Sequence, residues 1–102
     1  MDRYVITTRL RPGAASAAEE LLSAGPPFDP GDAGLSAHSA YLGDDRVYLV
    51  FEGESARTKA LELARQHVAD VSRWENLVWE LPSIVEDVPA TARCVYTWQL
   101  RR

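Results

Sequence analysis

Residues 34–53, GLSAHSAYLGDDRVYLVFEG, form the stretch that decides the fold. A glycine and two aspartates at 43–45 separate two runs rich in β-branched and aromatic residues, which predicts a hairpin with strands at 35–42 and 46–52. The resulting register places one set of side chains on one face of the hairpin: His38, Ala40, Leu42, Val47, Leu49 and Phe51. The other face carries a second set: Ala37, Ser39, Tyr41, Tyr48, Val50 and Glu52. Neither set is typical of a face that only water covers.

The segments on either side of the hairpin predict two further strands and three helical stretches. The predicted elements are, in chain order, a strand at 3–11, a helix at 14–24, the hairpin, helices at 56–69 and 72–81, and a strand at 93–100. Proline and glycine punctuate this order, and residues 83–92 are expected to form an irregular connection.

The order β-α-β-β-α-β is the split-βαβ pattern of ferredoxin-like folds. We therefore expect an α+β fold and one domain over residues 1–102. The helices before and after the hairpin should cover the same face of a four-stranded antiparallel sheet. The expected strand order is 4-1-3-2, with the first and third strands in the centre.

Composition and charge exclude several classes of partner. The 102 residues are 46% hydrophobic and 25% charged, as in ordinary globular domains, and the net charge is −4. That charge argues against nucleic acid and anionic membranes, because both bind clustered cations. The chain has one cysteine, no signal-peptide pattern at its N-terminus and no apolar run of membrane-spanning length. We therefore expect a cytoplasmic protein.

Two helices can cover only one face of such a sheet. The other face, which carries Tyr41 and Tyr48, is expected to leave a contiguous apolar patch larger than monomers usually show. Burial of a few hundred Å² of such surface favours association by several kcal/mol, at about 25 cal/mol per Å². The sequence therefore predicts a two-fold homodimer whose sheets pack face to face.

Four segments carry a resemblance to a known superfamily: RLRPG at 9–13, GLSAHSAYLGDD at 34–45, VYLVFEGES at 47–55 and VYTWQL at 95–100. Together with the order of elements, they resemble the dimeric α/β-barrel superfamily, and in particular its antibiotic-biosynthesis-monooxygenase-like members. The resemblance covers nearly the whole chain. It implies a ferredoxin-like fold, a dimer built from two such sheets, and a pocket between sheet and helices in each subunit.

The chain departs from that pattern at two places. Monooxygenase-like members often carry a tryptophan at the end of the third strand, where this chain has Glu52 and Gly53. Haem-degrading members use an asparagine on the first strand, and the segment at 3–11 has none. The resemblance therefore does not extend to haem degradation.

Histidine and cysteine are the side chains most suited to chemistry, and each also has a structural interpretation. His38 lies in the middle of a predicted strand, where it is either a buried neutral imidazole or a general base that lines a pocket. His67 and Cys94 are expected to be structural, on a helix stripe and as a small buried side chain. The spacing of these residues matches no zinc motif, and the glycines form no phosphate loop, so no metal or cofactor is expected.

Aromatic residues form the other candidate constellation. They are either core and dimer interface or the walls of a flat pocket for a planar organic ligand. The predicted ligand-binding residues are Phe28, Trp74, Tyr96 and Trp98, with His38 as the predicted catalytic or anchoring group.

Three functions remain open at this point. The first is a non-catalytic protein that binds a small apolar or aromatic ligand. The second is a cofactor-independent monooxygenase or isomerase that acts on an aromatic or polyketide-like compound. The third is a structural or accessory dimer without a ligand. A cavity beside His38 would separate the first two from the third.

Overall fold

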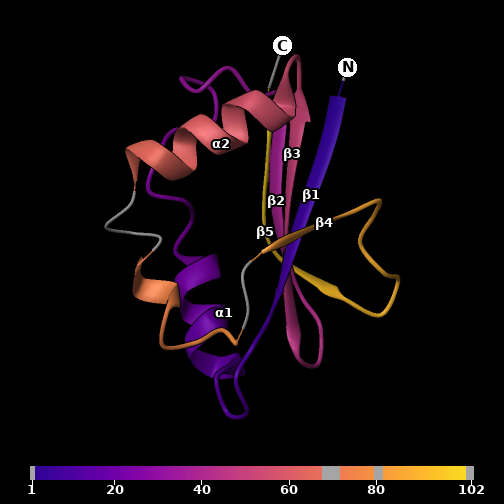
Figure 1. Ribbon diagram of the computed structural model, residues 1–102. Coiled ribbons are helices and arrows are strands. Elements are labelled where there is room, and N and C mark those ends of the chain that lie inside the picture. Colours follow the sequence, from indigo (N-terminus) through magenta and orange to yellow (C-terminus); the bar gives the residue numbers. More distant parts are fainter. Residues whose placement is uncertain (1, 68–71, 80–81, 101–102) are drawn as a thin grey trace.

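The computed structural model describes residues 2–67, 72–79 and 82–100 (Figure 1). Its elements are β1 (Asp2–Arg9), α1 (Ala15–Ser23), β2 (Ala37–Leu42), β3 (Arg46–Gly53), α2 (Ala56–Gln66), a short 3₁₀ helix η1 (Ser72–Trp74), β4 (Ser83–Val85) and β5 (Arg93–Gln99). The α+β class expected from the sequence is confirmed.

The sheet has five antiparallel strands in the order β4-β1-β3-β2-β5. The expected number of four strands is therefore wrong, and the strand expected at 93–100, which is β5, does not take its expected place beside β1. β4 arises within the segment expected to be irregular and pairs with β1 over Val5–Thr7. Because β4 occupies the outer edge of β1, the last strand pairs with β2 at the opposite edge.

The hairpin of β2 and β3 has the register expected from its turn. His38 lies opposite Phe51, Ala40 opposite Leu49, and Leu42 opposite Val47. Since side chains alternate along a strand, this register decides which side chains face the helices.

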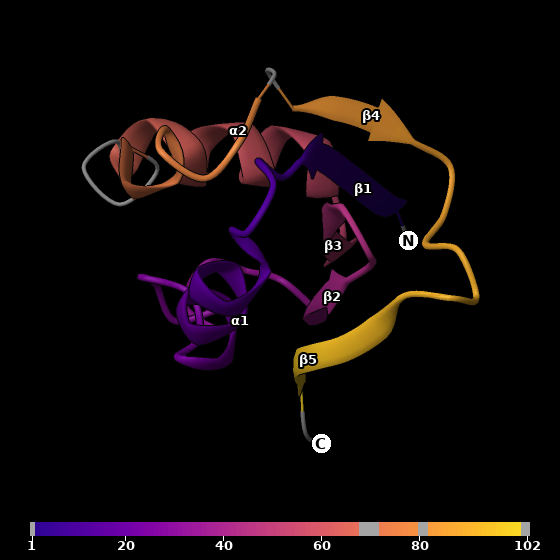
Figure 2. The ribbon, with the colours of Figure 1, turned by 90° about the horizontal axis from the view of Figure 1, so that it is seen from below.

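Both α1 and α2 lie on the same side of the sheet (Figure 2). Buried side chains beneath them form two clusters. The first cluster lies under α1 and consists of Leu10, Ala14, Ala18, Leu22, Ala40, Leu42 and Val47. The second lies under α2 and consists of Leu35, Phe51, Ala56, Ala60 and Leu63, with partly buried Tyr4, Ile6, Phe28 and Trp98 packed against it. Leu49 packs against both clusters, which makes the core continuous.

The centre of the opposite face of the sheet is also buried. Val5 and Val50 face each other across β1 and β3 with 1% and 2% of their surface exposed. The segment between β4 and β5 runs from one edge of the sheet to the other around this side (Figure 2). Arg3 ties that segment to the sheet, because its guanidinium lies 2.7 Å from Asp87 and 3.1 Å from Glu52.

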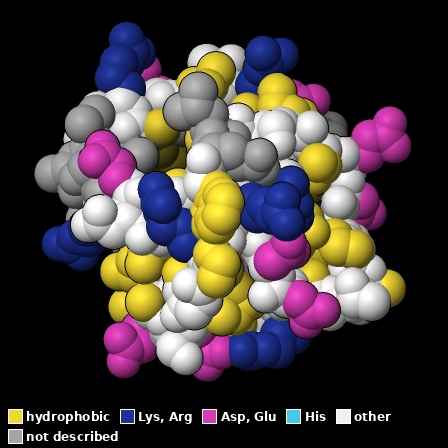
Figure 3. Space-filling model, turned by 60° about the horizontal axis from the view of Figure 1, so that its bottom comes forward, with side chains coloured by type: hydrophobic (Ala, Val, Ile, Leu, Met, Phe, Trp, Pro, Cys, Tyr) yellow, Lys and Arg dark blue, Asp and Glu magenta, His cyan; other side chains and the backbone are white. Residues whose placement is uncertain are grey.

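The exposed patch of rings expected on this face is not found among the described residues, where Tyr41 and Tyr48 are half-buried. The exposed large hydrophobic side chains of the described residues are Leu61, Trp79, Ile84 and Leu100. On the side of the molecule shown in Figure 3, hydrophobic side chains are interspersed with basic and acidic ones.

The helix expected at 72–81 is wrong for the residues that the structure describes; Glu80 and Leu81 lie outside them. Only η1 is helical, and Val78 forms an isolated bridge with Leu10. The backbone explains the difference, because Leu77 O accepts from Arg11 N at 2.7 Å and Trp79 N donates to Arg9 O at 2.9 Å. Leu77 N and Val78 N still donate to Trp74 O, but the bonds to Arg9 and Arg11 attach the segment to the end of β1, so the helix does not continue.

Among the described residues, no helix has the length and apolar character needed to cross a membrane.

Candidate functional site

His38 lies in the middle of β2, between Phe51 on β3 and Trp98 on β5. Only 4% of its surface is exposed. The alternation that puts Ala40 and Leu42 beneath the helices puts His38 there as well. The side chain is therefore an imidazole inside the core on the helix-covered face.

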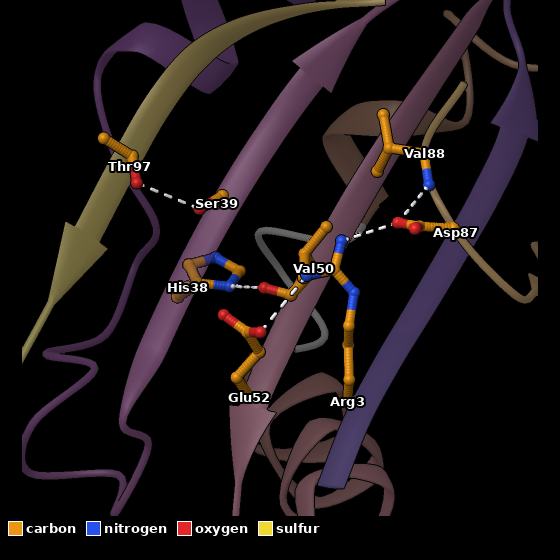
Figure 4. A network of polar contacts seen from close by, with 8 residues as sticks. All are labelled: Arg3, His38, Ser39, Val50, Glu52, Asp87, Val88 and Thr97. Carbon is orange, nitrogen blue, oxygen red and sulfur yellow. Dashed lines mark hydrogen bonds and ion pairs between the residues drawn. The ribbon is translucent and has the colours of Figure 1, made fainter. Parts of the chain in front are cut away.

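The Nδ1 atom of His38 lies 2.9 Å from the carbonyl oxygen of Val50 (Figure 4). A carbonyl can only accept, so Nδ1 carries the hydrogen and donates it. In the neutral ring, Nε2 then keeps its lone pair and can only accept. Burial lowers the pKa of His38 below its ordinary value, and the bond to Val50 offsets part of this effect. The site thus holds a neutral imidazole whose Nε2 has a lone pair that can accept a hydrogen bond.

Aromatic rings from three other parts of the chain surround this imidazole. The centroids of Phe51, Phe28 and Tyr96 lie 4.6, 5.5 and 5.9 Å from that of His38. Phe28 also contacts His67, at the end of α2, with 5.9 Å between ring centroids. We call the set His38, Phe28, Phe51, His67, Tyr96 and Trp98 the His38 ring cluster.

The segment 26–34, which we call the Phe28 loop, covers the His38 ring cluster. Asp29 Oδ1 accepts from Gly31 N at 2.9 Å, which shapes the turn after Phe28. Lys59 Nζ on α2 donates to Gly34 O at 2.8 Å and attaches the far end of the loop. A Cβ on Gly31 would lie 3.3 Å from Cζ2 of Trp98, so the loop packs closely on β5.

The structure brings together three of the four predicted ligand-binding residues. Phe28 and Tyr96 contact His38, and Trp98 lies opposite it on β5. Trp74 packs against the other cluster, under α1, because its segment is attached to the end of β1. Trp74 is therefore not part of the cluster around His38.

The structure gives His67 a contact that the sequence did not indicate, and it contradicts the expectation for Cys94. His67 contacts Phe28, so the fold brings both histidines of the chain to one phenyl ring. No local pattern in the sequence indicates this contact, which depends on the path of the Phe28 loop. Cys94 is exposed, with Sγ 3.4 Å from Tyr96 O, so its expected burial is wrong.

An open hollow of about 290 Å³ lies along one stripe of α2, at Thr58, Leu61, Glu62 and Arg65. Within the described ranges, no group of three or more histidine, cysteine and acidic side chains has the geometry to hold a metal ion.

Comparison of the chain with family models, with curated proteins and with solved structures finds no match.

Proposed function

We propose that the chain binds a small planar aromatic molecule that carries a hydroxyl group, at the His38 ring cluster. One observation supports this most directly: a buried imidazole enclosed by aromatic rings, with one nitrogen bonded to the backbone. Small-molecule sites are typically apolar with a few well-placed polar groups. The resemblance to the dimeric α/β-barrel superfamily, whose pockets lie between sheet and helices, points to the same place.

The protonation state of His38 is the reason for proposing a hydroxyl group on the ligand. With Nδ1–H donated to Val50, the neutral ring offers only an acceptor at Nε2, so a ligand must supply a donor. A carboxylate supplies no donor and loses its hydration on entering an apolar site. A neutral phenol or enol satisfies both conditions.

A catalytic form of the same site is the second candidate. A neutral imidazole can take the proton of a bound hydroxyl, and the lowered pKa of His38 keeps the ring in its basic form at neutral pH. A cofactor-independent monooxygenase or isomerase would use His38 in this way. Conversion of a bound phenol, measured by mass spectrometry and lost in a His38→Leu variant, distinguishes catalysis from binding alone.

Thermal-shift and NMR titrations with phenol, toluene and benzoate test the binding proposal. We expect phenol to bind most tightly and benzoate least. In a His38→Leu variant, the advantage of phenol over toluene should fall about fivefold, because one buried hydrogen bond contributes about 1 kcal/mol. A Trp74→Phe variant is the control, since Trp74 packs in the other cluster. Equal affinity for all three compounds, or unchanged selectivity in His38→Leu, contradicts the proposal.

Homodimerisation through the face opposite the helices stays a prediction. Sedimentation at micromolar concentration tests it, because the chain alone has a mass of 11.3 kDa. A species of twice that mass supports the dimer, and a single species of one chain contradicts it.

A further inference from the structure

We infer that Phe28 is an internal occupant of the ring-binding position, and that a ligand binds only when the Phe28 loop swings this ring out. The inference rests on the proposed function. It specifies the size of the ligand, because one aromatic ring takes the place of the Phe28 phenyl ring. It also gives the Phe28 loop the role of a lid.

The position of Phe28 resembles that of a bound ligand. Its ring lies between two imidazoles from different elements, 5.5 Å from His38 on β2 and 5.9 Å from His67 after α2. It comes from a loop, whereas Phe51 and Tyr96 come from strands that the sheet holds in place. Among the rings that contact His38, Phe28 is therefore the one that can leave without breaking the sheet.

The ends of the Phe28 loop have the conformations that a hinge needs. Gly25 directly before the loop and Gly34 at its end have φ angles of +87° and +83°, which favour glycine. Hinges are a few residues at the ends of elements that absorb large backbone changes. Between them, Pro26, Pro27 and Pro30 restrict the backbone, so the intervening segment loses little entropy when it closes.

Besides the packing of Gly31 on Trp98 and of Ala33 on the cluster under α2, the Phe28 loop has two exposed polar contacts. Lys59 Nζ donates to Gly34 O, and the Asp29 carboxylate accepts from the Gly31 amide; both bonds are exposed. Exposed polar contacts of this kind contribute little each. A closed lid reduces the apparent affinity of a ligand by the fraction of molecules that are open. Loss of one contact outside the cluster should therefore tighten binding without creating new space in the core.

Titration of phenol into four proteins, followed by NMR, tests the inference: wild type, Phe28→Ala, Lys59→Met and the control Arg57→Met. Arg57 is exposed on α2, so its variant also removes one positive charge from that helix. We expect at least tenfold tighter binding in Phe28→Ala, about threefold to fivefold tighter in Lys59→Met, and no change in Arg57→Met. Circular dichroism establishes folding, and Phe28→Leu replaces Phe28→Ala if the latter does not fold.

Three results overturn the inference. If Phe28→Ala binds tightly but Lys59→Met binds like wild type, the substitution has only created a cavity and the loop is not a lid. If all four proteins bind phenol equally, Phe28 does not compete, and the proposed function survives without the lid. If none of them binds, both the lid and the proposed function are wrong.

Discussion

Both faces of the sheet are buried at their centres, but by different kinds of side chain. The helix-covered face holds an imidazole among aromatic rings, beneath α2 and the Phe28 loop. The centre of the opposite face holds small and β-branched side chains. Val5 on β1 and Val50 on β3, for example, lie directly opposite each other. Close-packed small side chains leave no place for a ligand, whereas a ring on a loop can be replaced by another ring. The difference therefore favours the helix-covered face as the place of the proposed binding site.

Phe51→Ala should have the largest effect, because it removes a ring that is 5% exposed and contacts both His38 and Tyr4. We expect a loss of about 3–5 kcal/mol in the free energy of unfolding, measured with urea. Leu61→Ala is the control, since Leu61 is 56% exposed and its variant should stay within about 0.5 kcal/mol of wild type. A loss below about 1 kcal/mol for Phe51→Ala would show that this face is not a packed core.

Val5→Ala probes the opposite face in the same way. Val5 is 1% exposed within one chain, so its truncation should cost about 2 kcal/mol. If the chain alone covers this face, the loss is the same at low and high protein concentration. If a second copy covers it, the loss depends on concentration, because association then contributes to stability. Urea unfolding at two protein concentrations a hundredfold apart separates the two cases.

The sequence was sufficient for features that depend on local periodicity. The register of the hairpin followed from the turn at 43–45 and the alternation of side chains, and it placed His38 opposite Phe51 correctly. The same alternation grouped Tyr96 and Trp98 on one side of the last strand, and the pairing of β5 with β2 brings that side to the face of His38. The face of each side chain is thus predictable within a strand or a hairpin, whereas the neighbour of the last strand was not.

Features that depend on competition between distant segments were not predictable. Both β4 and β5 can extend the sheet, and only pairing with Val5–Thr7 shows which of them takes the edge of β1. Trp74 follows a helix-like spacing, but backbone bonds to Arg9 and Arg11 draw its segment away from His38. The approach of His67 to Phe28 likewise depends on where a loop folds.

The free energy of unfolding should depend on pH through His38, which lies on the helix-covered face. The pKa of His38 is lowered in the folded protein relative to its ordinary value of 6.5, so the unfolded chain takes up the proton first. Stability should therefore fall as the pH drops below about 6.5 and level off below the folded pKa.

Urea midpoints of wild type and His38→Leu between pH 8 and 5 measure this effect. The difference between the two proteins isolates His38 from the other titrating groups. We expect that difference to shift in favour of the variant as the pH falls, because leucine takes up no proton. A difference that is constant with pH would mean that His38 is not buried in its neutral form.

Arg3→Met should have the smallest effect on stability, and it tests how the opposite face is closed. The guanidinium lies 2.7 Å from Asp87 and 3.1 Å from Glu52 at an exposed position, so we expect a small fall in melting temperature that disappears at high salt. The pKa of Asp87 is the sharper measurement.

The pKa of Asp87 is lowered first by the amide of Val88, which donates to its carboxylate at 2.8 Å, and then by Arg3. In Arg3→Met, an NMR titration should show this pKa rising toward 3.8 without reaching it, because the Val88 bond remains. Both folded values lie below the ordinary one, so the stabilisation is present above about 3.8 and is lost as the pH falls through the folded pKa. An unchanged pKa would mean that Arg3 does not hold the segment between β4 and β5 against the sheet. Burial of Val5 and Val50 would then depend on the strands alone.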